Sequence, residues 1–337
     1  MREWRRKHQS LVAALTLALI LGGAAFYMIY MPNRSWSDEL PPLTMDQAEI
    51  AERLRRHIQV LAADIGERNV WREDRLETAA GYIESALQAT GYDVSSQVFS
   101  AQGIGVRNLE AILDGHSSAE DIVVIGAHYD TVPGSPGAND NGSGVAALLE
   151  IARLLAGKPL ARSVRFVAFV NEEAPFFYTR EMGSYRYADR ARERGEKISA
   201  MLSLETIGYY ADARGSQRYP NPVYAWFYPD TANFIGFVGN LKSRRLVRRC
   251  LGSFRRHAAF PSEGVAAPGN MLGIHWSDHW SFWQAGFPAL MVTDTALFRY
   301  PHYHAATDTP ERIDYERLAR VVSGLAAVTA DLAESGP

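Results

Sequence analysis

The fold class is decided by the segment I-V-V-I-G-A-H-Y-D at residues 122–130. Its first six residues, from Ile122 to Ala127, are apolar or glycine, and such a run is typical of a strand buried on both faces of a sheet. The polar residues His128 and Asp130 follow at once. Because ligands gather at the carboxyl ends of strands in open α/β sheets, we expect this strand to carry functional residues to such an edge.

Helices and strands alternate on both sides of this segment. Apolar residues at helical spacing predict helices at 45–63, 73–90, 142–155, 184–194 and 315–332. Short apolar or alternating runs predict strands at 94–99, 108–113, 122–127, 164–170, 199–204 and 288–292. The alternation predicts an α/β fold in which helices sandwich a mixed, mostly parallel central sheet. Residues 210–275 show the least regular pattern, and we predict no order of elements there.

Composition limits the kind of site that the chain can hold. The net charge is −3 at pH 7, so we expect no nucleic-acid partner, and the arginine cluster at 244–256 has the spacing of a solvated helix face. The single Cys250 provides neither an intrachain disulfide nor a thiol cluster. A metal site in this chain must therefore use imidazole and carboxylate ligands.

The N-terminal residues predict a membrane anchor. Four basic residues between positions 2 and 7 precede an apolar run at 11–30, and about 20 helical residues match the thickness of a bilayer core. The basic flank predicts a cytoplasmic tail at 1–10 and a folded domain outside the cytoplasm. A cleaved signal peptide followed by secretion is the alternative, although its apolar core is usually only about 7 to 15 residues long. Proline-rich residues 31–44 are expected to form a linker, and the folded domain is expected at 45–337.

Acidic residues follow two further predicted strands. Glu172 and Glu173 come after the strand at 164–170, and Glu205 follows the strand at 199–204. A glycine-rich loop at 137–144 places Asp140 near the start of a helix, where it could also act only as a helix-start acid. Zinc accepts imidazole and carboxylate ligands, and one of two adjacent glutamates could bind metal while the other takes a proton from water. Hydrated surface acids are the competing interpretation for each of these residues.

Five motifs together resemble one known family. They are G-A-H-Y-D-T at 126–131, G-A-N-D-N-G-S-G at 137–144, N-E-E at 171–173, S-D-H-W-S-F at 277–282 and Y-H-A-A-T-D-T at 303–309. In order and spacing they resemble the co-catalytic zinc aminopeptidases of the MH clan, peptidase family M28, over about residues 45–335. The resemblance implies a zinc peptidase domain at 45–337 that uses two zinc ions to hydrolyse N-terminal amino acids from peptides.

The resemblance also implies a role for each site residue. The implied metal ligands are His128 and Glu205 for one zinc, Glu173 and His304 for the other, and Asp140 as the bridge between them. Glu172 would be the general base, and Asp130 would orient His128. The family often holds the peptide bond after the bridging aspartate in the cis form, which here is Asp140-Asn141.

Some positions depart from the family pattern or leave alternatives open. Glu205 stands where most relatives have an aspartate, and His302 competes with His304, which has the better spacing to Asp308-Thr309. The connection at 174–182 is longer than usual and is expected at the substrate mouth. Aromatic residues at 219–228 are expected to pack in the core, with a wall of a substrate pocket as the alternative.

Two other functions remain open at this point. One is a single-zinc, glutaminyl cyclase-like aminoacyl transferase on the same fold, and the other is a non-catalytic ectodomain that keeps the fold for partner binding. The expected partner is a peptide or aminoacyl substrate, with the membrane contacted through the N-terminal helix. The sequence predicts no oligomeric state.

Overall fold

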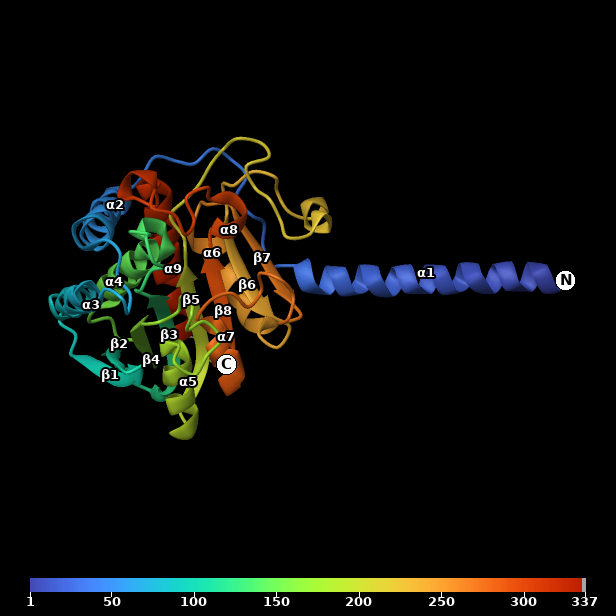
Figure 1. Ribbon diagram of the computed structural model, residues 1–337. Helices are drawn as coiled ribbons and strands as arrows, with labels where there is room; N and C mark the ends of the chain where they lie inside the picture. The colour runs from blue at the N-terminus through green and yellow to red at the C-terminus, as the bar shows by residue number, and fades with distance from the viewer. Residues whose placement is uncertain (335–337) are drawn as a thin grey trace.

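The computed structural model describes residues 1–334, without the side chains at positions 2, 3, 5–7, 10, 11, 14 and 21. Its centre is an eight-stranded sheet with the strand order β1-β2-β4-β3-β5-β8-β6-β7 (Figure 1). The strands are β1 (Val94–Ala101), β2 (Ile104–Leu113), β3 (Ser118–His128), β4 (Arg162–Phe169), β5 (Lys197–Glu205), β6 (Ile235–Asn240), β7 (Ser262–Ala267) and β8 (Ala289–Thr293).

The middle of the sheet is parallel and its edges are mixed. Neighbours β4, β3, β5 and β8 all run in the same direction, whereas β2 is antiparallel to β1 and β4, and β6 is antiparallel to β8 but parallel to β7. The predicted α/β fold with a mixed, mostly parallel sheet is confirmed. Because the central strands are parallel, their carboxyl ends meet at one edge of the sheet.

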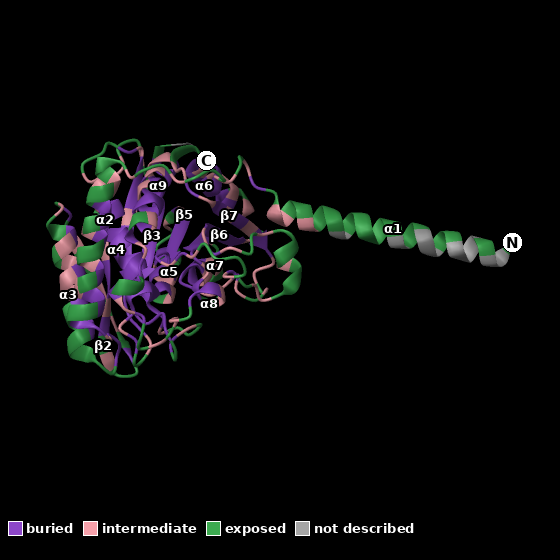
Figure 2. Ribbon diagram, turned by 90° about the horizontal axis from the view of Figure 1, so that it is seen from above, coloured by how far each residue is buried: buried purple, intermediate pink, exposed green. Residues whose placement is uncertain are grey.

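Helices cover both faces of the sheet, and β3 shows how the sequence directs them. Val123 and Ile125 pack into the larger apolar cluster, beneath α2 (Met45–Ile58), α3 (Glu73–Gln88), α4 (Gly144–Leu155), α6 (Arg244–His257) and α9 (Tyr315–Glu334). Ile122 and Val124 point to the opposite face, where α5 (Gly183–Glu193) and α7 (His279–Ala285) supply the partners. Alternate residues of a strand face opposite sides, so a continuous apolar run serves both layers (Figure 2).

The prediction missed elements in the region 210–275. There β6, α6 and β7 form, together with a short 3-10 helix, η3 (Pro222–Trp226). Strand β6 has the sequence Ile-Gly-Phe-Val-Gly-Asn, and a Cβ at Gly239 would lie 2.5 Å from Cγ2 of Val247 on α6. The glycine that weakens the strand pattern in the sequence thus permits a close helix contact in the fold.

The N-terminal helix α1 (Arg2–Ile29) projects from the body of the protein (Figure 1). In the described part of the chain, no helix is both long and apolar enough to cross a membrane. The predicted basic flank, and positions 11, 14 and 21 of the predicted anchor at 11–30, lie outside the described side chains. The membrane anchor therefore stays a prediction.

Several arginines of α6 are not simply solvated, although the sequence predicted a solvated helix face. They bind backbone carbonyl groups at the end of α1 and at the start of the linker. Arg255 donates hydrogen bonds to the carbonyl oxygens of Pro32 (3.0 Å) and Asn33 (2.9 Å), and Arg244 donates to the carbonyl oxygen of Tyr27 (2.6 Å). Arg248 similarly donates to the carbonyl oxygen of Tyr30. These arginines therefore hold the end of α1 and the start of the linker against α6.

Candidate metal centre

Three strand ends bring polar residues to one place. His128 is the last residue of β3 and Glu205 is the last residue of β5, and Glu172 and Glu173 follow closely after β4. The strands are in register, with His128 opposite Phe169 of β4. Asn171 lies between β4 and the two glutamates and has a left-handed backbone conformation, with φ of 60°. The order of parallel strands thus determines which acids meet His128.

A rigid loop brings Asp140 to the same edge. Gly137 has φ of 64°, and a Cβ there would lie 2.3 Å from the side chain of Thr131, so this turn requires glycine. The carboxylate of Asp308 accepts hydrogen bonds from the backbone N–H groups of Asn139 (2.9 Å) and Asp140 (3.1 Å). The Asp140-Asn141 peptide bond is cis, as the resemblance implied.

A fully buried arginine holds the loop that carries Asp140 through hydrogen bonds to the backbone. Arg68 donates to the carbonyl oxygens of Tyr129 (2.6 Å), Pro136 (2.7 Å) and Gly137 (2.9 Å). Buried arginine is costly unless its donors are satisfied, and here the donors are used to fix both the segment after β3 and the loop that carries Asp140. The sequence analysis did not single out Arg68.

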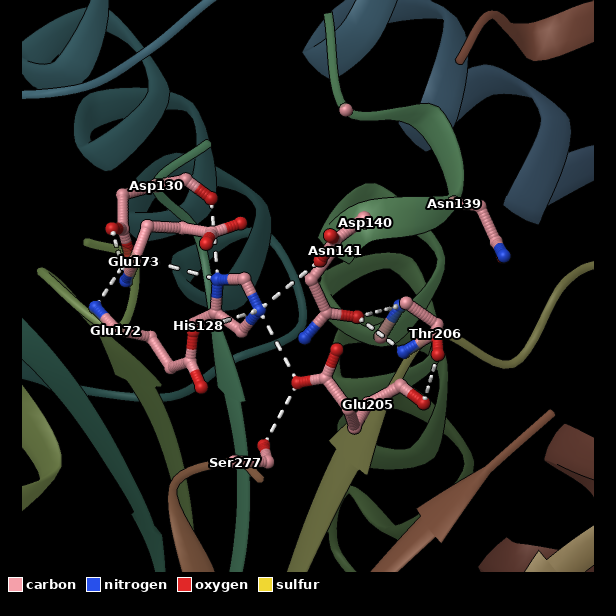
Figure 3. Close-up of polar contacts among 12 residues, drawn as sticks. His128, Asp130, Asn139, Asp140, Asn141, Glu172, Glu173, Glu205, Thr206 and Ser277 are labelled. Atoms are coloured by element: carbon pink, nitrogen blue, oxygen red, sulfur yellow. Dashed lines mark hydrogen bonds and ion pairs between the residues drawn. The ribbon is translucent and has the colours of Figure 1, made fainter. Parts of the chain in front are cut away.

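The side chains form two groups of possible metal ligands that share Asp140. In the first group, Nε2 of His128 lies 3.4 Å from Oδ1 of Asp140 and 3.3 Å from Oε2 of Glu205 (Figure 3). In the second, Nε2 of His304 lies 3.0 Å from Oδ2 of Asp140 and 3.3 Å from Oε1 of Glu173. All five side chains implied as ligands by the resemblance therefore converge.

His302 does not join either group. Its Nδ1 atom is hydrogen-bonded with the hydroxyl of Thr307 at 2.8 Å, and that contact is exposed. The structure thus places His304, and not His302, against Asp140 and Glu173.

The residues present fit a pair of cations. Among the described side chains, Nε2 of His128, Oδ2 of Asp140 and Oε1 of Glu173 are buried and have no hydrogen-bond partner. Leaving such atoms unsatisfied costs about 1–3 kcal/mol each, more for charged groups. They all point into the two ligand groups, and imidazole with carboxylate is a donor set that suits zinc.

The pKa shifts of the candidate ligands indicate an excess of negative charge at the centre. Burial, followed by the nearby Asp140 carboxylate, raises the pKa of Glu173 to about 7. For His304, burial opposes the charged form, but the adjacent carboxylates of Asp140 and Glu173 outweigh burial and raise the pKa to about 10. Cations bound between these groups would balance the negative charge of the carboxylates. Without cations, protonated imidazoles provide that positive charge.

Glu172 lies beside the two ligand groups without belonging to either. Its Oε2 atom is 3.9 Å from Nε2 of His128, and burial, followed by the carboxylates of Glu205 and Glu173, raises its pKa well above the usual value. A carboxylate in this position can exchange a proton with a molecule bound at the centre.

Asp130 contacts His128 in a different way from the one expected. Nδ1 of His128 donates to the backbone carbonyl of Asp130 at 3.2 Å, while the nearest carboxylate oxygen is 3.6 Å away. The carboxylate instead accepts from the backbone N–H groups of Glu172 and Glu173, both at 3.1 Å. Asp130 therefore fixes the segment that carries these two glutamates, and its backbone orients the histidine.

Two residues near the centre were missed by the sequence reasoning. The hydroxyl of Ser277 donates to Oε2 of Glu205 at 2.8 Å. The ring of Tyr303 stacks on His304 with a centroid distance of 3.9 Å, and burial together with nearby acids raises the pKa of its phenol. Ser277 begins the motif at 277–282, and Tyr303 begins the motif at 303–309, directly before His304. Their positions in these motifs were the only sequence feature that could have indicated a role at the site.

An apolar cavity of about 130 Å³ adjoins the centre. Glu205 and Tyr303, which lie at the centre, also line this cavity, and Phe234, Val238 and Met291 are among its apolar walls. Within 219–228, the side chains of Tyr219, Tyr224 and Tyr228 line the cavity, whereas Trp226 and Phe227 are exposed. The expected packing of these aromatic residues in the core is therefore wrong, and the alternative of a pocket wall describes the three tyrosines.

The sequence of this chain is similar to those of known peptidases. Residues 108–329 match the family model Peptidase family M28. The chain is 36% identical over 306 residues to the uncharacterized protein YfbL of Escherichia coli, covering 88% of this chain and 92% of YfbL. It is also 33% identical over 208 residues to aminopeptidase YwaD of Bacillus subtilis, covering 59% of this chain but only 38% of YwaD.

Solved structures show the same fold at low sequence identity. An aminopeptidase from Aneurinibacillus sp. strain AM-1 matches with a TM-score of 0.66 and 17% identity, covering 86% of this chain and 96% of that one. A glutaminyl cyclase from Fimbriiglobus ruber matches with a TM-score of 0.61 and 20% identity, covering 89% and 99%. At these identities the structures support the fold alone, and it is the sequence matches that identify the family: the chain belongs to peptidase family M28.

Proposed function

We propose that this protein is a metallo-aminopeptidase that uses two zinc ions to remove N-terminal amino acids from peptides. The observation that carries the proposal is the pair of ligand groups joined by Asp140. His128 and Glu205 would complete one zinc site, and Glu173 and His304 would complete the other. Membership of family M28 and the similarity to aminopeptidase YwaD support this assignment.

The zinc ions would supply Lewis acidity, which polarises a carbonyl oxygen and lowers the pKa of water. Glu172 would accept a proton from the attacking water and return it to the departing amine. Asp130 supports this role, because its carboxylate holds the backbone of Glu172 in place.

The apolar cavity would receive the N-terminal side chain of the substrate. Because Glu205 and Tyr303 line both the cavity and the centre, a side chain in the cavity would leave the adjoining peptide bond beside the proposed metal ligands. The walls are mainly apolar and aromatic, which favours large apolar side chains over charged ones.

Glu172→Gln is the direct test. The amide keeps the size of the side chain but cannot take up the proton, so we expect turnover of aminoacyl arylamides to fall by about 100- to 10,000-fold. Bound zinc, measured by elemental analysis, should remain near normal. Glu193→Gln, the same change at an exposed position of α5, is the matched control. Full activity of the Glu172→Gln variant would refute the assignment of the base.

A second candidate is a glutaminyl cyclase-like aminoacyl transferase with a single zinc ion, which the fold similarity to the Fimbriiglobus ruber protein keeps open. Zinc stoichiometry and a glutaminyl-peptide assay separate the two functions. Two zinc ions and release of free amino acids favour the aminopeptidase, whereas one zinc ion and cyclisation of glutamine favour the transferase. A non-catalytic ectodomain would show neither activity in the zinc-loaded protein.

The location of the protein is also a proposal. The apolar run at 11–30 supports a single-pass protein with its N-terminus in the cytoplasm and the peptidase domain on the other side of the membrane. Secretion after cleavage of a signal peptide is the alternative, and N-terminal sequencing of the mature protein distinguishes them.

A further inference from the structure

The aromatic loop at 219–228 has two faces with different surroundings. Its three tyrosines line the cavity, but Val223, Trp226 and Phe227 point to solvent, and Trp226 is 79% exposed. Leaving three large apolar side chains exposed to water forgoes part of the free energy of burying them. Such a cluster on a surface indicates a contact with another molecule or with a membrane.

The base of α1 lies beside this loop. The hydroxyl of Tyr228 donates to the carbonyl oxygen of Gly264 on β7 at 3.0 Å, and the side chain of Met31, directly after α1, packs against the same glycine. Figure 1 shows η3 next to the end of α1, on the side of the body from which that helix projects. The loop and the base of α1 therefore both contact β7 and lie near each other.

The described part of α1 makes this surface more apolar still. Leu15, Leu19, Ile20 and Phe26 are all more than half exposed along the helix. Tyr27 and Tyr30, at its base, are also exposed. A helix with apolar residues on several sides is ordinarily surrounded by other apolar material, and tyrosine and tryptophan are enriched where lipid meets water.

Cationic side chains border the same surface. Lys242 and Arg245 are exposed at the start of α6, and residues 241–257 contain no acidic residue. Arg244 holds the C-terminal end of α1 through a hydrogen bond to the carbonyl of Tyr27, and its guanidinium lies 3.8 Å from the centroid of the Tyr27 ring. The free carbonyl groups at a helix C-terminus carry partial negative charge, so this contact stabilises the junction of α1 with the body.

We propose that this surface rests on the headgroup region of a phospholipid bilayer that contains anionic lipids. We call it the aromatic–basic face, and it consists of Val223, Trp226, Phe227, Tyr27, Lys242 and Arg245. The aromatic side chains enter the interface and the cations meet the lipid phosphates. Because the same loop lines the cavity, the cavity is held beside the bilayer. This last step rests on the proposed function, in which the cavity is the substrate pocket, and it suits peptides that are attached to or released at a membrane.

The test places a polarity-sensitive fluorophore on the aromatic–basic face. The full chain carrying Trp226→Cys is labelled and reconstituted with vesicles of phosphatidylcholine and phosphatidylglycerol that contain a headgroup-level nitroxide quencher. Trp71→Cys is the matched control, because Trp71 is 54% exposed and lies two residues before α3, a helix on the side of the body away from α1 (Figure 1). Cys250 is fully buried and its thiol pKa is raised to about 12, so it does not react.

We expect the probe at position 226 to shift to shorter wavelengths and to be quenched severalfold more than the probe at position 71. Val223→Cys provides a second position with the same expectation. Equal quenching at positions 226 and 71, or no binding to vesicles, would overturn the proposal. A wavelength shift that appears without vesicles and grows with protein concentration would also overturn it, since the face would then bind a second copy. Quenching that is unchanged in vesicles of phosphatidylcholine alone would overturn the role of the cations.

Discussion

Two groups of neighbouring strands in the sheet are built differently. The group β4, β3 and β5 ends in buried polar residues, and the backbone on both sides of the candidate metal centre is fixed by Asp130 and Asp308. The group β8, β6 and β7 contributes walls of an apolar cavity, which an irregular segment at 217–228 also lines. Under the proposed function, the chemistry lies on strand ends, and recognition lies largely on a loop.

The difference follows from the cost of misplacing each kind of side chain. A buried carboxylate that loses its partners is strongly destabilising, so each acid of the centre needs a defined backbone position and several hydrogen bonds. An apolar wall needs only volume and close packing, and many sequences provide these. We therefore expect substitutions at the metal centre to have larger effects on activity than substitutions in the cavity.

The largest effect should come from Asp140→Asn. Asp140 belongs to both ligand groups, so its loss removes a charged ligand from each, and we expect activity to fall by more than about 1,000-fold with zinc lost from both positions. Glu173→Gln is the comparison, because it alters one group only and should leave about one zinc per chain. Elemental analysis of the two purified variants measures the difference. Two zinc ions retained in Asp140→Asn would show that the two groups are not joined through this residue.

A smaller effect is expected from Asp308→Asn. Asp308 touches no ligand side chain but accepts from the backbone of Asn139 and Asp140, and from the hydroxyl of Tyr300 at 2.7 Å. Loss of its negative charge should loosen the Asp140 loop and weaken zinc affinity by about 10- to 100-fold, as for other outer partners of metal ligands. Competition with a zinc chelator measures the affinity. Tyr300→Phe keeps the carboxylate and should weaken affinity less, and equal effects of the two variants would contradict this explanation.

The smallest effect, and the most selective one, should come from Met291→Trp in the cavity. The larger ring reduces the space for a substrate side chain, so kcat/KM for leucyl and phenylalanyl arylamides should fall by about tenfold or more, while alanyl arylamide should be affected much less. Zinc content should stay normal, which separates this variant from those at the metal centre. A uniform loss across all three substrates would mean that the cavity does not bind the N-terminal side chain.

Most of the group β4, β3 and β5 could be predicted from sequence. The run at 122–127 and the polar residues after it identified β3 and His128, because a buried parallel strand must be apolar throughout and ligands meet at strand ends. The order of β6, α6 and β7 could not be predicted, since short strands with glycine carry little periodic signal. The role of Arg68 was equally hidden, because one arginine in a sequence gives no sign of burial.

The sequence by itself determined the α/β class, because that class depends on residue type and local periodicity. Its five motifs carried the resemblance that implied the family and the residues that meet at the centre. Only the tertiary structure decided that His304 and not His302 faces Asp140, that the Asp130 carboxylate holds the backbone of Glu172 and Glu173, and that the loop at 219–228 divides into a pocket wall and an exposed aromatic surface. These outcomes depend on which segments distant in sequence lie within a few ångströms of one another, and no local pattern records that distance.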